Sequence, residues 1–327
     1  MTKTDAKTVW AEYMKGVSYK TRLGLYETVS QCEDFYAGDQ WKGVNAPDLP
    51  KPTLNMLKRV VAYFTAMIVS DDVAIRFSPH APDPGLEKTC ALLSSELDRI
   101  LESQKAGTKH REALRNAAVD GDACLYLWFD PDKETGQNAK GDVAIDLVEN
   151  TCVHFGNPYT KDVQTQPYII LSMRRPAEEV RSEAEENGVS PSDAARISPS
   201  MESELGEPFG GDGLVTVLLR LWKEGGTVRA QKSVKDLIVR EAWDTGLKLY
   251  PVAWLCWEAS RNSCHGIGAI TGLIPNQIAV NKLFAMAIRS VEMNAFPKVV
   301  YDATKIDRWT NRVGEAIAVA GSPENTI

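Results

Sequence analysis

The sequence has few of the residues that catalytic and metal sites usually need. Its 327 residues include only four histidines and six cysteines. The cysteines are scattered and form no Cys-x-x-Cys pair, which predicts reduced, mostly buried thiols. No G-x-S-x-G elbow, Walker loop or His-Glu-x-x-His motif is present. We therefore expect a protein that is not an enzyme and that holds no cofactor or metal.

Basic charge and long apolar runs are also scarce. Lysine and arginine total 37 against 44 aspartates and glutamates, which gives a net charge of −7. This balance argues against a general nucleic-acid binder, because neutralising phosphates requires clustered basic residues. The longest apolar-rich stretch, residues 54–69, contains Lys58 and Arg59 and is predicted to be a packed helix. The N-terminus lacks the apolar core of a secretory signal, so we expect a cytoplasmic chain.

The acidic residues are concentrated in one segment. Residues 178–207 contain nine acids and two arginines, and nine minus two equals the whole net charge. The usual meaning of such a run is a solvated helix and linker, and the sharper alternative is a docking surface for a basic partner. The acids are Glu178, Glu179, Glu183, Glu185, Glu186, Asp193, Glu202, Glu204 and Glu207, and the bases are Arg181 and Arg196.

What is present is an ordinary globular composition, 43% apolar and 25% charged, in a chain long enough for about two domains. The first third has the spacing of amphipathic helices, the second of them capped by Thr53 and ended by residues 70–72. A short strand is predicted at residues 73–77. The first predicted helix has the face Leu25, Val29, Cys32 and Tyr36 and ends at Gly38. The second has the face Leu54, Leu57, Val61, Phe64 and Ile68. The third has the face Leu86, Cys90, Leu93, Leu97 and Ile100.

The middle of the chain predicts strands. Residues 122–130, 142–149 and 166–173 read as three strands of a small sheet resting on the helices. A short acidic helix follows, from Pro176 to a closing Gly188. Residues 189–213 are rich in Ser, Pro, Gly and acid and predict a module boundary. Beyond them, strands at hairpin spacing predict an insert-like β module, and the chain returns to helix over residues 267–295.

Two segments resemble binding motifs. Asp130, Asp132 and Glu134 alternate as in a calcium loop, but that loop needs Gly at the sixth position and an acid at the twelfth, where Thr135 and Gly141 stand. A hairpin turn is therefore the preferred interpretation.

The glycine-rich HGIGAITG follows a strand, as a dinucleotide-binding turn does. Its spacing is G-x-G-x-x-x-G and seven residues separate it from the strand, so we interpret it as closely packed backbone. His265 adjoins Cys264, but neighbouring residues in a strand point to opposite faces, which argues against a joint site.

The final predicted helix is long and carries little charge. Pro275 permits a fresh helix start, and Lys282, Arg289 and Glu292 are the only charges from residue 276 to 295. Such a helix must pack on several neighbours, which a ring of identical subunits supplies. The stripe read at heptad spacing is Ile267, Ile270, Ile274, Gln277, Asn281, Phe284, Ile288, Val291 and Ala295.

The sequence resembles the portal proteins of tailed bacteriophages. The resemblance covers nearly the whole chain in the same order, although no single motif is a catalytic signature. The segments that carry it are FYAGDQW (35–41), PKPTLNMLKRVV (50–61), YPVAWLCWE (250–258), NSCHG (262–266), PNQIAVNK (275–282) and AFPKVVYD (295–302).

The resemblance implies an α+β fold in five parts. These are a mixed α/β wing at residues 1–173, a first stem helix at 174–187, a β-rich clip at 188–259, a second stem helix at 260–295, and a return to the wing and tunnel-loop region at 296–327. Portal proteins usually continue into a C-terminal crown, so a shortened chain is expected. The expected first stem helix is shorter and more acidic than the resemblance implies.

The resemblance also implies a function. A portal subunit forms a homo-oligomeric ring, a dodecamer in the family, at one capsid vertex of the virion, and is assembled in the host cytoplasm. Its partners are the terminase large subunit, a head-tail adaptor, capsid or scaffold protein, and double-stranded DNA that passes without sequence specificity. Another head-tail adaptor or a nucleotide-binding enzyme remain as alternatives. The residues expected to pack the stem helix or form the ring interface are Ile274, Gln277, Asn281, Phe284, Ile288 and Val291. Those expected in an acidic segment that docks the motor are Glu183, Glu185 and Glu186.

Overall fold

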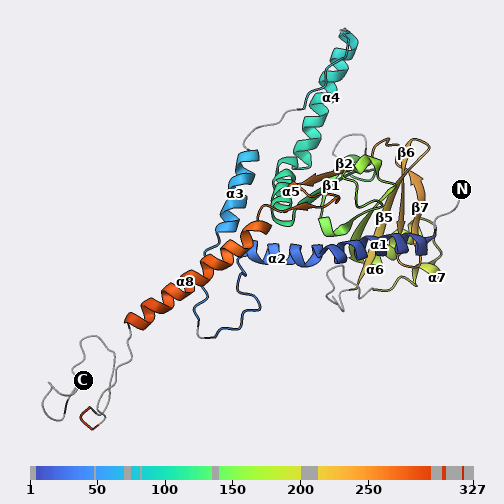
Figure 1. Cartoon of the computed structure of the whole chain (residues 1–327). Coiled ribbons are helices and arrows are strands. Elements are labelled where there is room, and N and C mark those ends of the chain that lie inside the picture. The colour runs from blue at the N-terminus through green and yellow to red at the C-terminus, as the bar shows by residue number, and fades with distance from the viewer. Residues whose placement is uncertain are drawn as a thin grey trace. The chain divides into compact units, whose positions relative to one another are not determined.

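The computed structural model describes residues 5–47, 49–69, 75–81, 83–134, 140–199, 213–295, 304–306 and 319 (Figure 1). The chain divides into two compact units. The first comprises Met1–Ala37 and Met56–Ile274, and the second comprises Gly38–Asn55 and Pro275–Ile327. The fold is mixed α+β, as the sequence predicts.

The first unit contains most of the regular structure. Its helices are α1 (Ala6–Leu23), α2 (Leu25–Ala37), α3 (Met56–Val69), α4 (Pro84–Ser103), α5 (Ala106–Asp120), α6 (Ala177–Glu186) and α7 (Pro191–Ala194), with short 3-10 turns η1 (Asn150–Cys152), η2 (Val163–Thr165) and η3 (Thr271–Leu273). Its strands are β1 (Asp122–Asp130), β2 (Asp142–Val148), β3 (Val153–Phe155), β4 (Tyr168–Pro176), β5 (Leu214–Glu224), β6 (Thr227–Ser233), β7 (Ile238–Asp244), β8 (Val252–Cys256), β9 (Glu258–Ala259) and β10 (Gly266–Ile267).

The largest sheet has five antiparallel strands in the order β3-β4-β5-β6-β7. Helix α1 packs on it through Val9 and Tyr13, which contact Ile170 and Leu218 (Figure 1). Helix α6 buries Ala177, Val180 and Ala184 in a cluster with β5 and β7 residues. Both helices cover the sheet because their apolar side chains recur at helical spacing.

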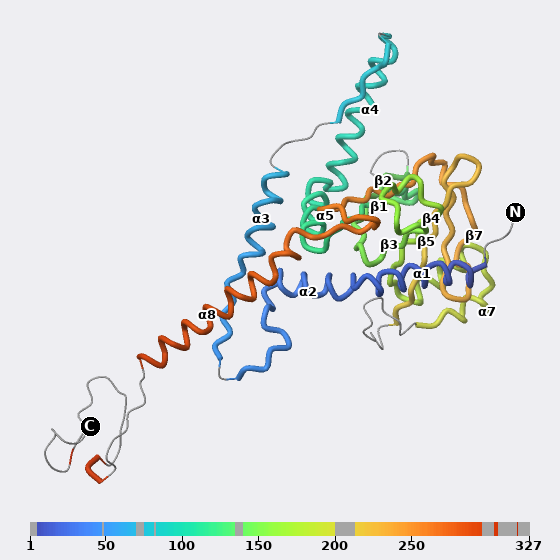
Figure 2. Tube along the Cα trace, viewed as in Figure 1, coloured from blue at the N-terminus to red at the C-terminus, as the bar shows by residue number. Residues whose placement is uncertain are grey.

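The sheet crosses the boundary predicted at residues 189–213. Strand β4 pairs with β5 from Tyr168↔Trp222 to Pro176↔Leu214, and Figure 2 shows the two strands side by side. The strands at 214–244 were predicted to form a separate module. They instead extend the sheet that begins with β3 and β4, since β4 and β5 pair directly and each is buried over several consecutive residues.

A second sheet has the order β2-β1-β8. The β1 and β2 strands match their predicted bounds to within one residue. The predicted third strand, residues 166–173, lies in the five-stranded sheet as part of β4. The third strand of this second sheet is instead β8, which pairs with β1 from Asp122↔Cys256 to Tyr126↔Val252.

Helix α3 differs from its prediction at its start and on its face. It begins at Met56 rather than after Thr53, and the Leu54 carbonyl accepts a hydrogen bond from Gln277 instead of entering the helix. Of the predicted face only Leu57 and Val61 are buried, whereas Leu54, Phe64 and Ile68 are exposed.

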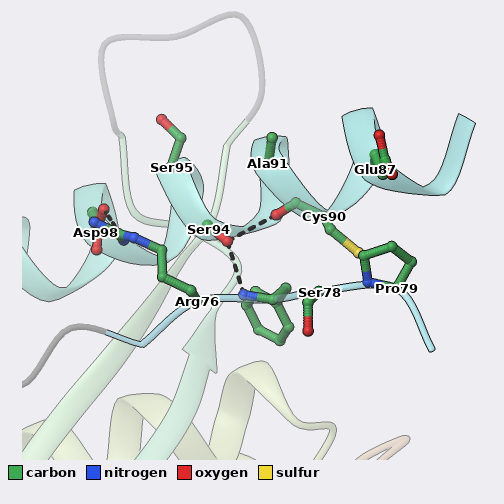
Figure 3. Close-up of a pocket in the computed structure, with 10 residues that line it drawn as sticks. Arg76, Ser78, Pro79, Glu87, Cys90, Ala91, Ser94, Ser95 and Asp98 are labelled. Atoms are coloured by element: carbon green, nitrogen blue, oxygen red, sulfur yellow. Dashed lines mark hydrogen bonds and ion pairs between the residues drawn. The ribbon is translucent and has the colours of Figure 1, made fainter. Parts of the chain in front are cut away.

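The strand predicted at residues 73–77 lies partly outside the described residues. Residues 75–79 run without strand pairing beside α4, where the Phe77 amide donates to Ser94 Oγ over 2.9 Å (Figure 3). Arg76 pairs with Asp98 across 2.6 Å on the same helix. These contacts line an open depression of about 520 Å³. Side-chain bonds to a helix thus replace the expected strand pairing.

Candidate subunit interface

The second unit is built around α8 (Ile274–Ala295), an unbroken helix that begins where Pro275 predicted a fresh start. Its buried side is formed by Ile274, Gln277, Asn281 and Ala285, which recur by three and four residues. This spacing follows the 3.6-residue turn of a straight helix. The heptad reading placed Phe284 on this side, but Ala285 occupies the position and Phe284 is 47% exposed.

A chain of amides holds α8 to the loop Gly38–Asn55 of the same unit. Gln277 Nε2 donates to the Leu54 carbonyl over 2.7 Å and to Asn281 Oδ1 over 2.9 Å. Asn281 Nδ2 in turn donates to Gln40 Oε1 over 2.6 Å. Gln277 and Asn281 are each 3% exposed, so these predicted interface residues bond inside their own unit. Buried amides need such partners, because an unpaired one is costly.

The rest of α8 exposes five large apolar side chains beside the charged Lys282, Arg289 and Glu292. We call Leu283, Phe284, Met286, Val291 and Met293 the outer face of α8; their exposed fractions run from 47% to 66%. Phe284 and Val291 belong to the predicted interface, and Ile288 is half-buried. Leu283, Met286 and Met293 were not predicted, although their spacing of three and seven residues is visible in the sequence. Contiguous exposed apolar side chains of this kind mark interaction surfaces.

The acidic helix α6 presents two different faces. Glu183 lies inward, where its carboxylate pairs with Arg175 Nη1 and with Lys232 Nζ, each over 2.5 Å. Burial by itself raises the pKa of Glu183, but the two cations outweigh it and hold the pKa below its ordinary value. Glu185 and Glu186 are exposed. Only these two of the predicted docking residues are therefore directed to solvent.

The other acids of this segment are placed as follows. Glu178 and Glu179 are largely exposed and make long ion pairs with Arg181 and Arg175, at 3.5 Å and 3.4 Å. Asp193 is paired with Arg196 at 3.3 Å. Glu202, Glu204 and Glu207 lie outside the described residues. The described part of the segment thus has an exposed acidic side that is partly neutralised by its own arginines.

No sequence pattern indicated the buried contact between the Asp122 carboxylate of β1 and the His265 ring in the segment that precedes α8. His265 Nδ1 lies 2.7 Å from Asp122 Oδ2, and the Gly266 amide donates to Asp122 Oδ1 over 2.7 Å. Asp122 and His265 are 1% and 3% exposed. The Ser263 hydroxyl accepts from the His265 amide over 3.0 Å. Since the partners are separated by 143 residues, no local spacing pointed to them.

Two of the three glycines of HGIGAITG, Gly266 and Gly268, lie against backbone, whereas Gly272 has nothing within 4 Å. A Cβ on Gly268 would stand 2.5 Å from the Val119 carbonyl oxygen, and one on Gly266 would stand 2.8 Å from the carbonyl oxygens of Gly121 and Glu258. This confirms the interpretation as closely packed backbone. The Gly266 amide, which a phosphate-binding turn would direct at its ligand, is bonded to Asp122.

The described residues of the segment that resembles a calcium loop form a turn. Asp130 Oδ1 accepts from the Asp132 amide over 3.1 Å, as in a turn, and Thr135 lies outside the described residues. In the part of the chain that the structure describes, no three His, Cys, Asp or Glu side chains are grouped to hold a metal. The six cysteines form no disulfide, and burial raises the pKa of Cys124, Cys256 and Cys264 to about 12.

No model of a known protein family matches the chain, and no curated protein matches it. Within the described ranges, no helix has both the length and the apolar character needed to cross a bilayer.

Proposed function

We propose that the chain is a portal subunit, which assembles with copies of itself into a ring at one vertex of a phage capsid. Double-stranded DNA would pass through this ring during packaging and ejection. The proposal starts from the resemblance of six sequence segments to portal proteins, and it excludes a catalytic role.

The observation that carries the proposal is the outer face of α8. A helix of 22 residues is about 33 Å long. Its inner side is occupied by the amide chain, and its outer face exposes five large apolar side chains. A helix that is apolar around most of its circumference is normally buried. Adjacent copies in a ring can cover this face, because in a head-to-tail ring the α8 of every copy can pack against a different surface of the next copy.

The segments that resemble the family meet in two places, which supports reading them as one pattern. Gln40, Leu54, Gln277 and Asn281 come from three of the segments and form the amide chain. Two further segments meet where Trp254 Nε1 donates to the Cys264 carbonyl over 3.0 Å. Segments distant in sequence are thus joined by hydrogen bonds at two places, one in each unit.

Ring formation is tested with the complete gene product. Mass photometry at micromolar concentration should detect one large closed species, and negative-stain images should show a central channel. Leu283→Ser, Met286→Ser and Val291→Ser, combined, should dissociate it, because the subunit contact loses most of its apolar area. Lys282→Gln, an exposed change on the same helix, is the matched control and should leave the ring intact.

Motor docking is assigned to the exposed acids of α6. Glu185→Gln with Glu186→Gln should weaken binding to the terminase large subunit, and the effect should fade as salt rises, because exposed charges are screened. Glu183 is unsuitable for this test, since its carboxylate pairs with Arg175 and Lys232. Binding that is unchanged at every salt concentration would remove the assignment.

A head-tail adaptor is the second candidate, and one observation favours it. Helix α6, at the place of the first stem helix, has only ten residues and packs on the sheet. An adaptor would join a portal ring that already exists, whereas a portal subunit forms a ring alone. The mass of the isolated gene product therefore distinguishes a portal subunit from an adaptor.

The nucleotide-binding alternative is tested by a thermal-shift screen, in which a rise in melting temperature at millimolar nucleotide would support it.

A further inference from the structure

The end of α2 meets the end of α5 through two carboxyl groups and one arginine. Arg115 Nη2, on α5, donates to Glu33 Oε2, on α2. The Arg115 guanidinium also lies over the Tyr36 ring, 4.7 Å from its centroid. Asp120 occupies the last position of α5, where the negative charge of Glu33 and the positive charge of Arg115 both act on its carboxyl. Arg115 is thus the cation close to both carboxyl groups, Glu33 and Asp120.

Asp120 is placed where its charge is poorly stabilised. Its Oδ1 is buried and has no hydrogen-bond partner, while the Arg115 guanidinium is paired with Glu33 and Asn116. Burial, together with the nearby charges of Glu33 and Glu149, raises the pKa of Asp120 to about 8. Protonated Asp120 can instead donate a hydrogen bond to Glu33, an arrangement typical of carboxyl pairs that share a site.

We propose that Asp120 and Glu33 share one proton and form a pH-sensitive clasp that holds the last turn of α2 against the end of α5. When the proton leaves for solvent, two carboxylates face each other with a single arginine between them, and their repulsion loosens the α2 end. Helix α2 ends at Ala37, the last residue before the Gly38–Asn55 segment of the second unit. The clasp would therefore hold or release the last turn of α2, which ends at Ala37, the last residue of this stretch of the first unit.

The other charged and titratable groups around the clasp do not account for a transition near pH 8. Burial raises the pKa of Cys32, the thiol on α2 nearest the pair, above its ordinary value. On β1, Asp122 is held by His265 and Gly266, and Lys20 of α1 donates to the Asn150 and Thr151 carbonyls. Lys58 of α3 lies 5.8 Å from the Tyr36 centroid, so the α3 charge nearest the clasp is a cation and not a third acid.

Hydrogen-deuterium exchange between pH 6.5 and 9.5, corrected for the intrinsic rate, tests the clasp. Amides of residues 32–37 should lose protection with a midpoint near pH 8, and Asp120→Asn should remove this step. Glu33→Gln should shift the midpoint to lower pH, because Asp120 loses its neighbouring negative charge. Glu27→Gln, on the exposed side of α2, should keep the wild-type midpoint. A step of unchanged midpoint in Asp120→Asn, or no step in the wild type, would overturn the proposal.

Discussion

Asp122 Oδ2 and His265 Nδ1 lie 2.7 Å apart in the interior of the first unit, and they join the start of β1 to the segment leading into α8. The Gly266 amide shares the same carboxylate. Both side chains are buried, so neither can be reached by a substrate. The pair therefore acts as a structural link between two parts of the chain that are far apart in sequence.

Removing this link should be costly. Asp122→Ala leaves the His265 ring and the Gly266 amide without their acceptor, and a buried unpaired polar group costs about 1–3 kcal/mol. We expect the free energy of unfolding in urea at pH 7 to fall by about 3 kcal/mol or more for the two groups together. Asp236→Ala, at an exposed position, should change it by less than about 0.5 kcal/mol. Equal effects of the two substitutions would contradict a structural role for the pair.

The glycines of HGIGAITG should differ sharply in their tolerance of alanine. Gly268→Ala places a methyl group against the Val119 carbonyl oxygen and should lower the melting temperature strongly, because backbone must move. Gly272→Ala meets nothing within 4 Å and serves as the control. Differential scanning calorimetry of the two variants checks this, and a stable Gly268→Ala would show that the close contact is not needed.

The amide chain of the second unit should stabilise it. Asn281→Ala leaves Gln277 and Gln40 without the partner that links them, with an expected loss of about 1–3 kcal/mol in the free energy of unfolding. Exchange of the Gly38–Asn55 amides should rise in the same variant. Asn294→Ala, on the exposed end of α8, is the control. If both variants unfold alike, the loop is not held by these bonds.

Glu183 should make stability depend on acid pH. Its pKa is lowered in the folded state, so its ion pairs stabilise the fold above its ordinary pKa of about 4.3 and are lost as the pH falls through the folded value. Glu183→Gln should cost about 1.5–3 kcal/mol at pH 7. Urea unfolding of the two proteins should converge toward pH 3. A constant difference across the pH range would mean that the charge of Glu183 contributes nothing.

The sequence predicted individual helices and strands better than it predicted which strands pair with one another. β1, α6 and the β5–β6 hairpin follow from spacings within a few residues, which side-chain periodicity determines. The pairings of β4 with β5 and of β8 with β1 depend on registers between distant segments, and composition suggested a boundary where the sheet is continuous. On α8 the helical face was found, but a heptad period places Phe284 inward where the 3.6-residue turn places Ala285.

The central claim is that copies of this chain cover the outer face of α8 in a closed ring. The most direct test is the mass of the complete gene product at micromolar concentration, measured by mass photometry beside the Leu283→Ser, Met286→Ser and Val291→Ser combination. The account predicts a single large ring for the wild type and monomers that remain folded for the combined variant. A wild-type protein that is strictly monomeric, or a ring that survives the three substitutions unchanged, would contradict it.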